Sequence, residues 1–285
     1  MNIIKNIHLL EKEIKELKKN NKVIGLVPTM GNLHNGHIKL ILLAKKYADV
    51  VIVSIFINPM QFNSLLDFKK YPKTFEQDCY ILRKEKVEIL FCPEINEIYP
   101  NGLKNNTYVD VPKLSNIIEG RARPGHFIGV TTIVCKLFNL IQPNFSFFGE
   151  KDYQQLLIIK KLVKELNYRI KIISLPTIRL PNGLAFSSRN KNLNSLEQKK
   201  APYLYKTIEQ ACNIIVQNKG KKIQKTIDMS RQYLIKKGFY IDIFSVYNSK
   251  TLGPISKKSK SIIILASVWL GNTRLIDNKK ITLKN

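Results

Sequence analysis

Strand-like and helix-like patterns alternate through the first two-thirds of this 285-residue chain, and this alternation limits the possible folds more than any other feature. Residues 50–57 are an almost continuous apolar run, as expected for a strand that is buried on both faces. Strands that alternate with helices of about 10–15 residues predict βαβ units and a parallel sheet. We therefore expect an α/β fold with a Rossmann-like parallel sheet.

The expected elements also predict two domains. In the first domain we expect strands at residues 23–27, 50–57, 87–92, 145–148 and 169–175, and helices at 37–47, 74–85, 129–141 and 152–166. The pattern changes after residue 181, where two helices (195–217 and 222–237) precede three short strands (240–247, 261–266 and 273–276). We therefore predict a Rossmann-like domain at residues 1–178 and a smaller C-terminal α+β domain at residues 179–285. Residues 1–22 are expected to form a short amphipathic helix.

Charge and cysteine content narrow the class of protein. The formal net charge is +26, but the lysines are spread along the whole chain, so the charge predicts a basic surface and not a nucleic-acid partner. Four cysteines without a CxxC pair favour a reducing compartment, and we expect a cytoplasmic protein. The N-terminal segment has charges inside its apolar stretch, unlike a secretory signal. The apolar runs fall well short of the roughly 20 residues of a membrane span, so no membrane partner is expected.

The segment with the clearest chemistry follows the first expected strand and reads PTMGNLHNGH (residues 28–37). A glycine-containing turn between a strand and a helix presents backbone N–H groups and the positive helix end, which suit an anion. His34 and His37 are three residues apart, so they share a face in the first helical turn. One histidine there could simply cap the helix. A pair can donate hydrogen bonds to phosphate oxygens and to charge that develops during transfer.

Four further polar segments lie at expected strand and helix ends, and a fifth comes near the end of the chain. They are FINPMQF (56–62), GRARPGHFIGV (120–130), FGEKDYQQL (148–156), GLAFSSRN (183–190) and TRLIDN (273–278). The phosphate-loop patterns GxxxxGK[ST] and GxGxxG do not occur. An HxGH motif directly after a strand resembles the signature motif of the nucleotidyltransferase superfamily. The complete set, in order over nearly the whole chain, resembles the pantothenate synthetase (pantoate–β-alanine ligase) family.

The resemblance implies a two-step ligase reaction. The carboxylate of (R)-pantoate attacks the α-phosphate of ATP, giving a pantoyl adenylate and pyrophosphate. The amine of β-alanine then attacks the acyl carbon, giving pantothenate and AMP. The substrate carboxylate is its own nucleophile, so the protein has to supply positioning and charge stabilisation. The resemblance also implies a homodimer, and a Mg²⁺ ion that arrives with ATP and needs few protein ligands. The sequence contains no evident metal-binding cluster, although Asp67 and Asp78 are acidic residues in the relevant region.

The resemblance also implies residue roles, carried over position by position. The expected catalytic residues are His34, His37, Lys151 and Arg189. The expected ATP-binding residues are Met30, Gly31, Asn32, Leu33, His34, Asn35, Gly36, His37, Gly149, Glu150, Lys151, Asp152, Ile178, Phe186, Ser187, Ser188 and Arg189. Pantoate is expected to meet Met30, Asn58, Gln61 and Gln155, and β-alanine to meet Gln61, Arg123 and His126. Lysine and arginine can bind the negative charge that is distributed over the phosphates, whereas neutral glutamines can bind the pantoate carboxylate and leave it nucleophilic.

Other interpretations remain at this point. Ser187 and Ser188 could cap the next helix, and Lys151 could be a solvated surface charge. Lys73 stands where the family usually has Arg, and Phe186 where Met is common, which puts loop dynamics in question. A class I aminoacyl-tRNA synthetase relative would share HxGH, and residues 257–261 (KKSKS) mimic its second phosphate loop, although we interpret them as a basic loop. A non-enzymatic nucleic-acid binder would instead need a clustered basic face.

Overall fold

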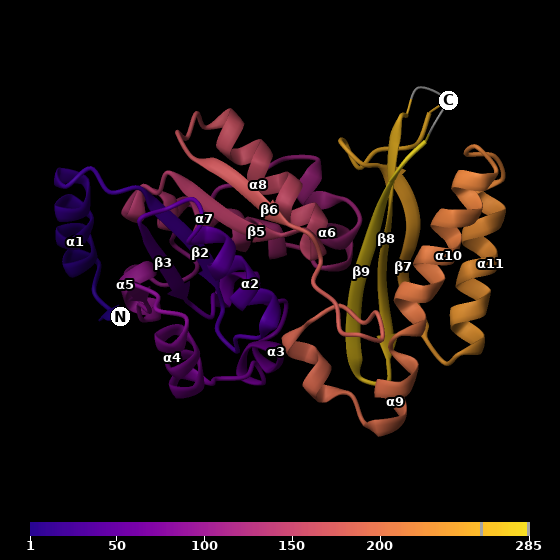
Figure 1. Ribbon diagram of the computed structural model, residues 1–285, viewed down its shortest axis with the longest axis horizontal. Helices are drawn as coiled ribbons and strands as arrows, with labels where there is room; N and C mark the ends of the chain where they lie inside the picture. Colours follow the sequence, from indigo (N-terminus) through magenta and orange to yellow (C-terminus); the bar gives the residue numbers. More distant parts are fainter. Residues whose placement is uncertain (257–258, 284–285) are drawn as a thin grey trace. The chain divides into compact units, whose positions relative to one another are not determined.

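The computed structural model describes residues 1–256 and 259–283, and the chain forms two compact units (Figure 1). Unit 1 comprises Met1–Glu150 and Gln155–Pro176, and unit 2 comprises Lys151–Gln154 and Thr177–Asn285. Unit 1 contains a six-stranded parallel sheet with helices, and unit 2 contains a three-stranded antiparallel sheet. The predicted α/β class, with a Rossmann-like sheet and a smaller C-terminal α+β part, is confirmed.

The sheet of unit 1 reverses its direction of growth at one point. Its strands are β1 (Asn2–Ile4), β2 (Ile24–Thr29), β3 (Val50–Ile55), β4 (Ile89–Phe91), β5 (Phe145–Gly149) and β6 (Lys171–Leu175). The spatial order is β1-β4-β3-β2-β5-β6, and all neighbours are parallel. The chain therefore moves from β2 toward one edge and later returns to β5 on its other side. Ligands of open α/β sheets bind at such a switch point, beyond the carboxyl ends of the strands.

Helices cover both faces of this sheet. Alternate residues of β3 enter different clusters: Val50 and Ile52 share a core with α1, α7 and α8, and Val51 and Val53 share one with α2 and α4. This two-sided burial explains why β3 is apolar at nearly every position. The helices are α1 (Ile7–Lys19), α2 (Asn35–Ala44), α4 (Phe75–Lys84), α7 (His126–Ile141) and α8 (Tyr153–Glu165). Shorter pieces are α3 (Leu65–Lys69), α5 (Ile95–Ile98), α6 (Glu119–Ala122), η1 (Pro59–Gln61), η2 (Leu114–Asn116) and η3 (Glu150–Asp152).

Unit 2 has its own core between a sheet and a helix pair. Its strands are β7 (Tyr240–Asn248), β8 (Ser261–Leu270) and β9 (Thr273–Thr282), in the order β7-β8-β9. Its helices are α9 (Ser195–Lys200), α10 (Tyr203–Gln217) and α11 (Ile223–Lys236), after the 3-10 turn η4 (Ser188–Asn192). Ile262, Ile264 and Val268, which alternate along β8, are buried with Leu204 and Ile208 of α10. This packing buries one face of the central strand.

Several predicted element bounds were wrong, and the structure gives the reason in each case. The N-terminal segment begins with β1, a three-residue strand without periodicity of its own, which forms by pairing with β4. The single helix predicted at 195–217 is interrupted near Pro202, because proline lacks the N–H group that a continuous helix needs. Residues 257 and 258 of the predicted basic loop lie outside the described residues. Among the described residues, no helix is long and apolar enough to cross a membrane.

Candidate active site

The turn after β2 lies at the switch point of the sheet, and a buried carboxylate shapes it. Gly31 has φ +77° and Asn32 has φ +49°, so two successive residues adopt left-handed backbone. Asp78 of α4, which is only 1% exposed, accepts the N–H of Asn32 at Oδ2 (2.9 Å) and that of Leu33 at Oδ1 (2.8 Å). The hydroxyl of Thr74 donates to the same carboxylate (3.1 Å). Asp78 therefore holds the turn that leads into α2.

The two histidines cap α2 and stack on each other. His34 is the N-cap residue, and its Nδ1 accepts the N–H of Gly36 (3.1 Å). The Nδ1 of His37 accepts the N–H of His34 (3.3 Å), which completes a capping box. The ring centroids are 4.1 Å apart. Because both Nδ1 atoms accept, each neutral ring carries its proton on Nε2. Capping therefore orients two Nε2–H donors from one helix end, and it also starts α2 two residues earlier than predicted.

Gln61 has its side-chain orientation set by a buried amide. Asn58, which is fully buried, donates from Nδ2 to Oε1 of Gln61 (3.2 Å) and to the carbonyl of Gly129 (2.9 Å). Its Oδ1 accepts the hydroxyl of Tyr99 (2.8 Å). Burial raises the pKa of the Tyr99 phenol, so the hydroxyl stays protonated and can donate. Since Gln61 must accept at Oε1, its Nε2 is directed to the other side, where it contacts Sδ of Met30 (2.9 Å).

Arg123 and His126 converge on the backbone of the same glutamine. Nδ1 of His126 is 2.8 Å from the carbonyl oxygen of Gln61, and Nε2 of His126 is 3.0 Å from Nη1 of Arg123. A guanidinium can only donate and a carbonyl can only accept, so the imidazole is neutral with its proton on Nδ1. Arg123 also donates to the Gln61 carbonyl from Nη2 (3.4 Å). These contacts bring together Gln61, Arg123 and His126, the three residues expected from the resemblance to meet β-alanine; that role stays a prediction.

Close packing and an adjacent cavity complete this part of unit 1. A Cβ atom at Gly129 would lie 2.5 Å from backbone atoms of Met60 and 2.7 Å from the backbone nitrogen of Gln61, so helix α7 can approach η1 this closely only with glycine there. A cavity of about 860 Å³ is lined by Met30 and Gly31, among others, and by residues that follow β3 and β4. Met30 therefore borders both this cavity and the amide of Gln61.

The expected residues after β5 divide between the two units. Gly149 and Glu150 belong to unit 1, where Oε1 of Glu150 accepts the hydroxyl of Ser174 (2.8 Å). Lys151 and Asp152 belong to unit 2 and lie in η3. Gln155 lies in the first turn of α8 in unit 1. Among the described residues, no group of three or more His, Cys, Asp or Glu side chains could hold a metal ion.

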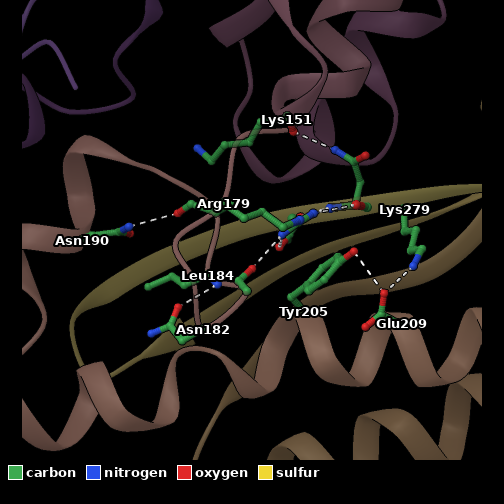
Figure 2. Close-up of polar contacts among 12 residues, drawn as sticks. Lys151, Arg179, Asn182, Leu184, Asn190, Tyr205, Glu209 and Lys279 are labelled. Carbon is green, nitrogen blue, oxygen red and sulfur yellow. Dashed lines mark hydrogen bonds and ion pairs between the residues drawn. The ribbon is translucent and has the colours of Figure 1, made fainter. Parts of the chain in front are cut away.

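The remaining expected residues of unit 2 lie on a short hairpin, residues 178–186, and on the 3-10 turn η4 that follows it. The N–H of Phe186 donates to the carbonyl of Ile178 (3.0 Å), and Arg179 and Ala185 form a β-bridge. Ser187 then caps η4, its Oγ accepting the N–H of Arg189 (3.2 Å), so the capping role considered for this serine is present. Figure 2 shows the polar contacts that hold the hairpin, centred on Arg179. Lys151 lies in the same view, because its carbonyl accepts a bond from Asn278 (2.9 Å).

Several residues of these networks have no role in the sequence prediction, among them Tyr99, Gly129, Arg179, Asp277 and Asn278. Gly129 belongs to the GRARPGHFIGV segment, and Asp277 and Asn278 belong to the TRLIDN segment, so a sequence signal existed for these three without an assigned function. Asp78 was noted as an acidic residue, and its structural partners now explain it. Tyr99 has no signal of this kind, since only the fold brings it to Asn58.

Comparison with known proteins identifies the family. The pantoate–β-alanine ligase family model matches residues 2–280. A pantothenate synthetase of Buchnera aphidicola subsp. Schizaphis graminum is 80% identical over 285 residues, which cover 100% of both chains. The chain belongs to the pantoate–β-alanine ligase family. The family resemblance and the ligase class predicted from the sequence are therefore confirmed.

Solved structures of family members have the same fold. The pantothenate synthetase of Thermus thermophilus matches with a TM-score of 0.90 and 35% identity, over 98% of this chain and 99% of that one. The pantoate–β-alanine ligase of Francisella tularensis, a complex with β-γ ATP and β-alanine, matches with a TM-score of 0.80 and 39% identity, over 98% and 97%. The fold of this chain therefore matches that of solved family members.

Proposed function

We propose that this chain joins (R)-pantoate to β-alanine at the expense of ATP, through a pantoyl adenylate, with release of pyrophosphate and AMP. The observation that carries the proposal is the stacked histidine pair at the switch point. Both Nδ1 atoms are used by backbone N–H groups, so the two Nε2–H groups are donors that suit phosphate oxygens. The family relative that was solved with β-γ ATP and β-alanine supports the same substrates for this chain.

In the first step, the protein has to hold the triphosphate and the pantoate carboxylate in line. We propose that residues 30–37 bind ATP, with His34 and His37 donating to the phosphates as negative charge shifts onto the leaving pyrophosphate. Such donors accelerate the step because they are oriented before the reaction begins. ATP enters as its Mg²⁺ complex, and the phosphates and water supply most ligands of that ion.

Pantoate is proposed to bind beside Gln61 and Gln155, next to Met30. The orientation of the Gln61 amide supports this, because its Nε2–H is held as a donor toward Met30 by the bond from Asn58 to Oε1. A neutral donor can bind a carboxylate or hydroxyl without suppressing its nucleophilicity. Asn58 is itself fully buried, so we assign it to positioning Gln61 instead of contacting substrate.

β-Alanine is proposed to bind near Gln61, Arg123 and His126, where its amine attacks the acyl carbon of the adenylate. In unit 2, Lys151, Asp152, Ile178 and residues 186–189 are proposed to bind the nucleotide, with Lys151 and Arg189 as the cationic groups. We propose that the C-terminal domain, residues 179–285, acts as a lid over the domain of residues 1–178, because a reactive acyl adenylate has to be protected from water. We also propose a cytoplasmic homodimer.

The test is isotope exchange between ATP and pyrophosphate, measured with pantoate and without β-alanine. We expect exchange that depends on pantoate, and AMP release that needs both acids. Pantoate-independent exchange, or none with folded protein, would refute the proposal. ATP–pyrophosphate exchange that depends on an amino acid instead of pantoate would indicate a relative of class I aminoacyl-tRNA synthetases.

A substitution at His37 separates capping from catalysis. His37→Gln keeps an acceptor for the His34 N–H, as glutamine does at this position of a capping box, but it removes the imidazole. We expect pantoate-dependent ATP–pyrophosphate exchange to fall by about 10²–10³-fold, the usual effect of losing one hydrogen-bond donor to developing negative charge, with little change in thermal stability. His8→Ala, an exposed position on α1, is the matched control and should be neutral.

A further inference from the structure

Two adjacent residues of β9 connect separate parts of unit 2. Asp277 and Asn278 are 3% and 8% exposed, so both polar side chains are buried. Asp277 accepts two hydrogen bonds from Arg179, from Nη1 to Oδ2 (2.6 Å) and from Nη2 to Oδ1 (2.8 Å). Asn278 donates from Nδ2 to the carbonyl of Lys151 (2.9 Å). Figure 2 draws the bonds that Arg179 and the carbonyl of Lys151 make to these two residues.

The bond to Asp277 places the hairpin that carries Ser187 and Arg189. Arg179 also donates to the carbonyl of Gly183 (3.1 Å) at the hairpin turn, and its guanidinium lies 3.4 Å from the centre of the Tyr205 ring. A planar, bidentate and stacked guanidinium has one geometry, unlike a lysine. Asn190 of η4 donates to the carbonyl of Ala185 (3.0 Å), which ties η4 to the hairpin. The position of the hairpin on β9 is therefore set by this arginine.

The bond from Asn278 places the other segment, and a second anchor reinforces it. The hydroxyl of Tyr153 donates to the carbonyl of Ser249 (2.9 Å), at the turn that follows β7. Residues 151–154 are thus attached to the antiparallel sheet at two points. This explains why they belong to unit 2, although β5 before them and most of α8 after them belong to unit 1.

We infer that Asp277 and Asn278 are positioning residues that hold Lys151 and residues 187–189 in one fixed arrangement within unit 2. The inference rests on the proposed function, in which both segments bind one nucleotide. Charges that have to meet the same phosphate chain act together only at a fixed spacing. Misplacement by about 1 Å costs on the order of 10²-fold in rate.

The test is a double-mutant cycle between Asn278 and Lys151. We expect Asn278→Ala to lower pantoate-dependent ATP–pyrophosphate exchange by about 10- to 100-fold through kcat, with KM for pantoate unchanged. In a Lys151→Ala background the same change should have little further effect, because Asn278 acts through Lys151. Equal losses in both backgrounds would overturn the inference. Asn218→Ala, which also removes a bond to a backbone carbonyl in unit 2, is the matched control.

A second readout does not depend on activity. Hydrogen–deuterium exchange of the peptide that covers residues 150–156 should become faster in Asn278→Ala, with the strand β9 itself unchanged. Tyr153→Phe removes the other anchor and keeps the ring, and it should give the same local increase if Asn278→Ala does not fold. If hydrogen–deuterium exchange of this peptide is unchanged, the anchoring is refuted, whether or not the wild type has ligase activity. If hydrogen–deuterium exchange becomes faster as expected but the wild type has no ligase activity, only the proposed function is refuted.

Discussion

Asp78 is the residue whose loss tests most directly how the turn before α2 is held. Its two carboxylate oxygens accept backbone N–H groups of Asn32 and Leu33, one at each oxygen, and the Thr74 hydroxyl as well. Asp78→Asn keeps the shape of the side chain but replaces one acceptor oxygen with an NH₂ donor. Whichever way the amide turns, one buried backbone N–H then faces a donor.

The expected magnitude follows from this count. An unsatisfied buried N–H costs about 1–3 kcal/mol, and the remaining backbone bond changes from a charged to a neutral acceptor, which loses about 1 kcal/mol more. We therefore expect Asp78→Asn to lower the free energy of unfolding by about 2–4 kcal/mol. For a unit of this size, each kcal/mol shifts the melting temperature by roughly 2–4 °C.

Urea unfolding followed by far-UV circular dichroism measures the loss. The single tryptophan, Trp269 on β8, reports unit 2 and serves as an internal reference in the same sample. The matched control is Asp49→Asn, because Asp49 is exposed and its Oδ2 accepts the backbone N–H of Val23 (2.8 Å). An amide oxygen can still accept that bond. If Asp78→Asn is no more destabilising than Asp49→Asn, the carboxylate does not hold the turn as described.

Three further predictions test other parts of the two units. Gly129→Ala should reduce pantoate-dependent ATP–pyrophosphate exchange by at least about 10-fold, because the new Cβ displaces the backbone of η1. Gly253→Ala is the control, since the nearest atom to its new Cβ is the Thr251 hydroxyl oxygen at 3.4 Å, and equal activity of the two variants would contradict the close approach of α7 to η1. Arg179→Lys should lower the free energy of unfolding of unit 2 by about 1–3 kcal/mol, since lysine keeps the charge but loses the paired bonds to Asp277. Urea unfolding followed by Trp269 fluorescence measures this, and an unchanged urea midpoint would contradict the prediction. Burial raises the pKa of the Cys212 thiol to about 12, so at pH 8 the thiol is protonated and unreactive. The thiol reagent DTNB should therefore label Cys212 only as fast as the protein unfolds, and rapid labelling of the native protein would refute this.

Much of the fold could be predicted from local patterns in the chain. The run at residues 50–57 indicated a strand buried on both faces, and β3 lies between two hydrophobic clusters. The alternation of patterns predicted a parallel sheet, and the change after residue 181 predicted a different second part. β1 escaped prediction, because three residues become a strand only by pairing with β4.

The candidate site was predictable to the extent that its motifs are continuous in sequence. HxGH marked the turn after β2, and its spacing alone placed both histidines on one helix end. The residues that hold this site are scattered, however. Asp78 of α4 bonds to the turn after β2, whereas Tyr99, the residue after α5, and Gly129 of α7 both bond to Asn58. A buried hydrogen bond between distant segments leaves no periodic signal in either segment.

The sequence by itself therefore determined the α/β class and the family, and it predicted a set of candidate site residues, because periodicity and short motifs are local properties of the chain. Only the tertiary structure decided which atoms of these residues donate and accept. It assigned the ring protons of His34 and His37 to Nε2, turned the amide of Gln61 through Asn58, and attached Lys151 to β9 through Asn278. Those choices depend on hydrogen-bond partners that are far away along the chain and come within about 3 Å only when the chain is folded.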